Sequence, residues 1–210
     1  AEFNMKKMFF IFLLSSILFG QSASTRIVPF SENKFFSNSK VFDKDTLKIF
    51  ALMAQFQEDK DDATTGNGRF GGLYSKDYGN EIIDPYPHDK NYFESKLLFA
   101  RNYFYKNSKG KLFIDYNVFD SVITVSKIMR EYSSPPKVED LKPTANFAKE
   151  VLQIFDSLYS SYDLSNYDMF IIFHAGVGKD IIIQGQINIE RNIPSVFFNE
   201  KSLKNFFGEN

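Results

Sequence analysis

The sequence predicts an α/β protein: a mostly parallel sheet with flanking helices and an additional edge strand. Two apolar runs, LKIFALMAQF at residues 47–56 and DMFIIFH at residues 168–174, are short and nearly continuous. Such runs are typical of strands that are buried on both faces. Two segments with apolar residues at helical spacing lie between these runs. Strands that alternate with helices along a chain favour a parallel sheet covered by helices.

The composition fits one globular domain. The 210 residues are 43% hydrophobic and 24% charged, and they include 25 Phe and no Trp, so Phe is expected to fill much of the core. The absence of Cys excludes disulfides, thiolate metal sites and a cysteine nucleophile. The formal net charge is -1, which provides no overall basic excess for nucleic acid, and we expect no nucleic-acid partner.

The N-terminal residues have the pattern of a bacterial signal peptide. Two lysines follow Met5, an apolar run covers residues 8–19, and small residues cover 20–24. We therefore expect signal peptide Met5–Ser24, cleavage after Ser24, and a secreted or periplasmic protein. The alternative is a membrane anchor, but the run is shorter than the ~18–20 apolar residues of a spanning helix. No stable membrane span is expected after cleavage.

The remaining domain limits follow from this assignment. Residues 1–4 precede the first Met and are interpreted as an upstream remnant. Residues 25–45 are polar and mixed, and are expected to form an N-terminal tail. Residues 46–210 are expected to form the folded domain, which begins with the first buried strand. The polar residues 58–68 that follow this strand are expected to form an exposed loop.

The first helix is expected after a cap at Asp89, with an apolar stripe and a stop at residues 107–110. The expected stripe is Phe93, Leu97, Ala100 and Phe104. Residues 111–119 alternate and predict a strand with one wetter face, and residues 121–142 are less regular. A second helix is expected at residues 144–159. Its expected stripe is Phe147, Val151, Ile154 and Leu158.

An additional strand is expected at residues 181–189, IIIQGQINI, which alternates in part and contains Gly185. An exposed edge strand can bind an extended peptide through main-chain hydrogen bonds. Alternatively, the C-terminal tail covers this edge. The tail contains IPSVFF and a short helical candidate at residues 201–207.

Several catalytic motifs are absent. HAGVGKD at residues 174–180 has Phe173 at the first glycine position of a phosphate loop, and Asp180 replaces the hydroxyl residue, so a tight turn is the better interpretation. The two histidines, His88 and His174, form no H-E-x-x-H zinc motif. We expect a hydrogen-bonded structural role for His174 and a helix-entry position for His88. No G-x-S-x-G turn exists to activate a serine.

The acidic loop is a candidate calcium site. Asp59, Asp61 and Asp62 cluster before a glycine-rich segment whose carbonyl groups could add ligands. The spacing does not match an EF-hand, and a solvated loop without a metal is the competing interpretation.

Four blocks of the sequence together resemble one family, the immune inhibitor A-like secreted bacterial zinc metallopeptidases. The blocks are LKIFALMAQFQEDKDDATTGNGRF, HDKNYFESKLLFARNYFYKNSKGKLFIDYNVF, SNYDMFIIFHAGVGKD and NIPSVFF. The resemblance covers about residues 41–207, and its more specific phrases are TTGNGRF, FIIFHAGVGKD and IPSVFF.

The resemblance implies the N-terminal part of a zincin-like peptidase domain. The family places its H-E-x-x-H helix and a third zinc ligand further along, and no residue here matches them, so no catalytic residue and no zinc ligand is transferred. Zinc is expected only in a full-length parent that cleaves peptide or protein substrates. By the same resemblance, residues 181–189 correspond to the edge strand of the substrate cleft, which makes Gln186, Ile187, Asn188 and Ile189 the candidate substrate-binding residues. The alternative is a stand-alone secreted α/β binding module.

Overall fold

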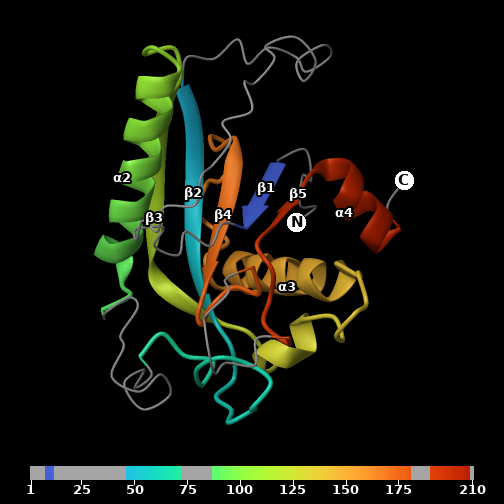
Figure 1. Cartoon of the computed structure of the whole chain (residues 1–210). Coiled ribbons are helices and arrows are strands. Elements are labelled where there is room, and N and C mark those ends of the chain that lie inside the picture. Colours follow the sequence, from blue (N-terminus) through green and yellow to red (C-terminus); the bar gives the residue numbers. More distant parts are fainter. Residues whose placement is uncertain (1–7, 12–45, 72–86, 181–189, 209–210) are drawn as a thin grey trace, which may run out of the picture.

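The computed structural model describes residues 8–11, 46–71, 87–180 and 190–208 (Figure 1). In these ranges five strands form one sheet with the order β3-β2-β4-β1-β5. The elements are β1 Met8–Ile11, β2 Thr46–Gln55, α2 Lys90–Asn107, β3 Phe113–Thr124, the 3₁₀ helix η1 Met129–Tyr132, α3 Lys142–Leu158, β4 Met169–His174, β5 Val196–Phe198 and α4 Glu200–Phe207.

The sheet is mostly parallel and has helices on both faces. Strand β2 pairs in parallel with β3 and β4, β1 pairs in parallel with β4, and β5 is antiparallel to β1. The chain moves from β2 to β3 through α2, then returns past β2 to β4 through α3. Right-handed crossovers in opposite directions place the two helices on opposite faces, as Figure 1 shows. The predicted fold class is confirmed.

Two apolar cores lie against the two faces of the sheet. On β2, Phe50, Leu52 and Ala54 contact the core on the α3 side, while the alternate residues Ile49 and Met53 contact the core on the α2 side. All six residues of β4 are buried. The near-continuous apolar runs therefore form strands that are covered on both faces, as the sequence predicted.

The helix ends follow the local sequence. The side chain of Asp89 caps α2 by accepting a hydrogen bond from the backbone N of Tyr92 at 3.0 Å, as predicted. Helix α4 begins with a capping box between Asn199 and Ser202. It ends at Gly208, whose φ of +71° is the left-handed conformation that glycine adopts at low cost.

Two predicted apolar stripes are correct only in part. On α2, Phe93 and Leu97 are buried, but Phe104 is 45% exposed, because the end of this helix lies beside the start of the outer strand β3, where Phe113 is exposed too. On α3, Phe147 and Val151 are buried, but Leu158 is 66% exposed at the last residue of the helix. The apolar residues keep their helical spacing along both helices, but the last ones lie beyond the area of sheet that the helices cover.

Strand β3 is longer than predicted. It continues past residue 119 to Thr124, into a segment that the sequence left irregular. The pairing with β2 shifts between Ala51↔Val118 and Met53↔Val122, which marks a bulge. A bulge interrupts the alternation of apolar and polar residues, and this is why the pattern stops early.

Two predicted segments have particular places in this fold. Strand β1 lies within the predicted signal peptide Met5–Ser24, so in the intact chain four of those residues occupy the strand position between β4 and β5. Residues 181–189, with the candidate substrate-binding residues Gln186, Ile187, Asn188 and Ile189, lie outside the described residues. Among the helices of the described ranges, none has the length and apolar character to cross a membrane.

Candidate functional site

The candidate site lies where the parallel strands β2, β3 and β4 end. The segment after β4 is joined to β2 by the hydrogen bond from Ala175 N to Ala54 O at 2.9 Å. The segment after β3 is joined to β2 by the bond from Val125 N to Gln55 O, also at 2.9 Å. Ligands of open α/β sheets bind at the carboxyl ends of the strands, where the strand order reverses. Here that position lies between β2 and β4.

Thr65 and Asn192 fill this position. Asn192 is fully buried, and Thr65 is 2% exposed. The amide Oδ1 of Asn192 accepts a hydrogen bond from Thr65 N, and its Nδ2 donates one to Thr65 Oγ1, both at 2.9 Å. The pair therefore ties the loop after β2 to the segment that leads into β5. The prediction of a wholly exposed loop at residues 58–68 is wrong for this part, because Thr64, Thr65 and Gly68 are buried.

The glycine-rich turn after β4 packs directly onto this pair. Val177 N donates a hydrogen bond to Thr65 Oγ1 at 3.1 Å. Gly176 has a φ of +87°, and a Cβ there would lie 2.5 Å from Met129 Cε and 3.3 Å from the carbonyl oxygen of Thr65. A side chain at Gly176 is disfavoured by the backbone conformation, and it would require the end of the buried Met129 side chain to move. The turn that the sequence predicted at residues 174–180 thus serves to close the end of the sheet.

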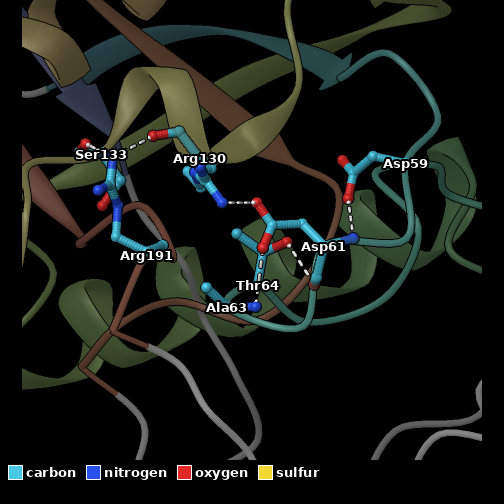
Figure 2. Close-up of polar contacts among 7 residues, drawn as sticks. All are labelled: Asp59, Asp61, Ala63, Thr64, Arg130, Ser133 and Arg191. Atoms are coloured by element: carbon cyan, nitrogen blue, oxygen red, sulfur yellow. Dashed lines mark hydrogen bonds and ion pairs between the residues drawn. The ribbon is translucent and has the colours of Figure 1, made fainter.

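The acidic loop is ordered by its own carboxylates (Figure 2). Asp59 Oδ1 accepts a hydrogen bond from Asp61 N at 2.8 Å, and Asp61 Oδ1 accepts one from Ala63 N at 2.9 Å. The second oxygen of Asp61 accepts a hydrogen bond from Arg130 Nη1 at 2.9 Å, and this ion pair joins the loop to η1. The Asp61 side chain is 12% exposed and that of Arg130 is 51% exposed.

These contacts bear on the predicted calcium site. Asp59 and Asp61 share one turn, and Asp62 is exposed. Both oxygens of Asp61 already accept hydrogen bonds, one of them from a guanidinium group. Within the described residues, no group of three acidic, histidine or cysteine side chains is arranged to hold a metal ion. Calcium binding by Asp59, Asp61 and Asp62 stays a prediction.

Arg191 joins the acidic loop to η1 through a second set of hydrogen bonds. Its Nη2 donates to the backbone oxygens of Arg130 at 2.8 Å and Ser133 at 3.0 Å, and its backbone N donates to Ala63 O at 3.2 Å (Figure 2). The next residue, Asn192, accepts a hydrogen bond at its backbone oxygen from Ser133 Oγ at 2.8 Å. Two consecutive residues therefore fasten η1 and the acidic loop together.

His174 ends β4 and is buried between aromatic rings. Its Nδ1 lies 2.9 Å from Ala175 O, so this nitrogen carries the proton and donates it to the carbonyl group. The rings of Phe56 and Phe147 pack edge-on at 5.9 and 6.2 Å between centroids. Burial lowers the pKa of His174 to about 4, so the imidazole is neutral near pH 7. Its geometry is that of the hydrogen-bonded structural residue that the sequence predicted.

A second polar pair, which is partly buried, joins η1 to α3. Tyr132 Oη donates to Glu150 Oε2 at 2.5 Å, and Ser126 N donates to Glu150 Oε1 at 2.6 Å. Burial opposes ionisation of Glu150, but the hydrogen bonds from Tyr132 and Ser126 outweigh it and lower the pKa of the carboxyl group. Burial and the bond to Glu150 raise the pKa of Tyr132.

Chemically, the site is a set of mostly paired polar groups that hold four segments at one end of the sheet. Three of its buried atoms have no hydrogen-bond partner within the described ranges: Asp59 Oδ2, His174 Nε2 and Arg191 Nε. Among the described residues, no serine is in hydrogen-bond contact with His174, and no set of metal ligands is brought together. Sequence reasoning missed Thr65, Asn192 and Arg191, since their partners lie far away in the chain and no local motif marks them. No family model, no curated protein and no solved structure matches the chain.

Proposed function

We propose that the chain is the N-terminal scaffold and substrate-cleft portion of a secreted zinc-dependent peptidase. The observation that carries the proposal is the fold itself: a parallel sheet with helices on both faces, whose turn after β4 leads from the carboxyl end of the sheet into residues 181–189. By the resemblance, residues 181–189 correspond to the edge strand that lines the substrate cleft of such a peptidase. The fixed loops around Thr65 and Asn192 support it, since a cleft wall must be rigid.

In this role the 210 residues alone are inactive. They contain no H-E-x-x-H motif, so they have no histidine pair for zinc and no glutamate to activate a zinc-bound water. His174 cannot substitute for the missing ligands, because it is buried among Phe rings and bonded to Ala175 O. Zinc and a peptide or protein substrate belong to the full-length parent. The role of Gln186, Ile187, Asn188 and Ile189 is to bind the substrate backbone.

The experiment reads the gene beyond the codon of Asn210 and assays both forms of the protein. We expect an open frame that encodes H-E-x-x-H, and casein hydrolysis by the longer protein that a zinc chelator abolishes. The matched control is the longer protein with the Glu of the H-E-x-x-H motif replaced by Gln. This variant should still bind zinc but should not hydrolyse casein. The 210-residue form should cleave nothing with or without zinc.

The alternative is a stand-alone secreted binding module. The observation in its favour is that the polar groups at the carboxyl end of the sheet pair with one another. A stop codon directly after Asn210, together with a chain that folds cooperatively alone, would replace the peptidase proposal with this one.

A further inference from the structure

Helix α2 carries a stripe of aromatic and basic residues beside its buried pair, Phe93 and Leu97. The stripe begins at Tyr92, which packs against the same core, and is exposed from Phe99 onward. Its members follow one another at intervals of three or four residues and therefore lie on one face of the helix. We call them the α2 stripe: Tyr92, Lys96, Phe99, Tyr103 and Lys106. In Figure 1 α2 is the outermost layer on its side of the sheet.

The central aromatic residues of the α2 stripe face solvent. Phe99 is 60% exposed and Tyr103 is 54% exposed, and their rings stack on each other at 6.3 Å between centroids with 23° between planes. Lys96 Nζ lies 4.5 Å from the centroid of the Tyr92 ring. A helix that is apolar toward its core and aromatic on its outer face has a surface that water does not favour.

The charge around the stripe is mostly positive, and Glu94 is the one acidic residue in the sequence of α2. From residue 95 to residue 114 the sequence has Lys96, Arg101, Lys106, Lys109 and Lys111, and no Asp or Glu, although the whole chain has a net charge of -1. Positive charge is thus concentrated on this helix and the turn that follows it. A partner for this surface must be anionic and must accept aromatic rings.

The combination of residues distinguishes between anionic partners. Protein interfaces are enriched in aromatic residues and Arg but depleted in Lys, and the α2 stripe contains two lysines and no arginine. Tyrosine and phenylalanine rings at the level of lipid headgroups, with lysines that reach the phosphates, are typical of helices that lie on a membrane surface. We propose that the α2 stripe binds the surface of an anionic lipid bilayer, with α2 parallel to it.

This contact is peripheral, since among the described residues no helix can span a bilayer. It would hold Phe99 and Tyr103 at the headgroup level while Lys96 and Lys106 interact with anionic phosphates. The loops at the carboxyl ends of β2 and β4 are built by other segments, so the bound surface leaves them accessible. An anionic lipid surface fits α2 whether the chain is part of a peptidase or a binding module.

The test is vesicle co-sedimentation of the full chain. The vesicles contain either phosphatidylcholine alone or phosphatidylcholine and phosphatidylglycerol in equal parts. The variants are Phe99→Ser with Tyr103→Ser, and Lys96→Gln with Lys106→Gln. Matched controls elsewhere on the surface are Leu158→Ser and the pair Lys60→Gln with Lys201→Gln. The N-terminal apolar run is present in every variant, so differences between variants report on the α2 stripe.

We expect binding to the anionic vesicles to fall about fivefold for each lysine removed and on the order of tenfold for the aromatic pair. The control variants should bind as the unchanged chain does. Equal urea midpoints of all variants would exclude unfolding as the cause. The proposal is overturned if both stripe variants bind anionic vesicles normally. It is also overturned if they instead lose binding to an oligothymidine or poly-glutamate probe, or lose self-association in sedimentation velocity, while vesicle binding persists.

Discussion

Asn192 and Thr65, 127 positions apart in the chain, make two side-chain hydrogen bonds in a position that excludes water. One amide group satisfies both the backbone N and the hydroxyl oxygen of Thr65. This relationship fixes the loop after β2 against the segment before β5, and it accounts for the burial of polar residues at the end of the sheet.

Replacement of Asn192 by Ala should destabilise the fold by about 3 kcal/mol, because it removes two buried hydrogen bonds and leaves the backbone N of Thr65 without a partner. The measurement is the free energy of unfolding in urea. Asn102→Ala on the exposed face of α2 is the matched control and should change it by less than about 0.5 kcal/mol. In combination with Thr65→Val, the loss should be smaller than the sum of the single losses, because both variants remove the bond from Asn192 Nδ2 to Thr65 Oγ1. Independent, additive losses would contradict the direct pairing.

The two glycines Gly176 and Gly66 separate the effects of backbone conformation and space. Both have positive φ, +87° and +72°, but a Cβ at Gly66 has nothing within 4 Å, whereas one at Gly176 meets Met129 and Thr65. Gly66→Ala should cost about 1 kcal/mol for the left-handed conformation alone. Gly176→Ala should cost about 1–3 kcal/mol more, since Met129 and the Thr65 loop must shift. Urea unfolding of both variants measures the difference, and equal costs would show that the turn is not tightly packed.

Burial of His174 should make stability depend on pH. Its pKa is about 4 in the folded chain and near 6.5 in the unfolded chain. Between pH 4 and pH 6.5 the unfolded chain therefore binds more protons at this residue than the folded chain does. Stability should therefore fall as the pH drops from 6.5 toward 4, by about 2 kcal/mol between pH ~7 and pH ~5. Glu150 acts in a lower range, because the stability from its lowered pKa is lost only as the pH falls below 4.5.

His174→Phe is the control for this pH dependence, since it fills the same space between Phe56 and Phe147 without a titratable group. Urea midpoints of both proteins across the acid range should show a shallower slope for the variant. Identical slopes would assign the pH dependence to other groups.

The absence of cysteine from the chain allows a direct test of the place of β1. Phe10 pairs with Phe197 across β1 and β5. The variant Phe10→Cys with Phe197→Cys should form an intramolecular disulfide under mild oxidation, because paired residues of neighbouring strands bring their Cβ atoms within reach. The control Phe10→Cys with Tyr103→Cys on α2 should stay reduced. Similar oxidation of both variants would contradict the sheet order β4-β1-β5.

The sequence was a good guide to elements whose environment repeats along the chain. The runs at β2 and β4 are nearly continuous in apolar residues because two helices on opposite faces cover them, so alternate residues of each strand contact the two cores. The cap at Asp89 and the short helix α4 were also predictable, since their hydrogen bonds lie within three or four residues.

The features that could not be predicted from the sequence depend on contacts between residues far apart in the chain. Thr65 was expected to be exposed in its loop, because nothing near it in the chain indicates Asn192. Phe104 has the helical spacing of the buried residues Phe93 and Leu97, yet its burial is decided by how far the sheet extends beneath the helix. The bulge between β2 and β3 likewise results from the pairing of two strands and leaves no periodic pattern in either.

The place of β1 has a consequence for maturation. Strand β5 pairs with β1, and in the described ranges it has no other strand beside it. If a signal peptidase removes residues 5–24, the precursor and the mature protein cannot have the same sheet. The outer backbone groups of β4 would then need a new partner, and the mature chain would differ from its precursor in topology as well as in length.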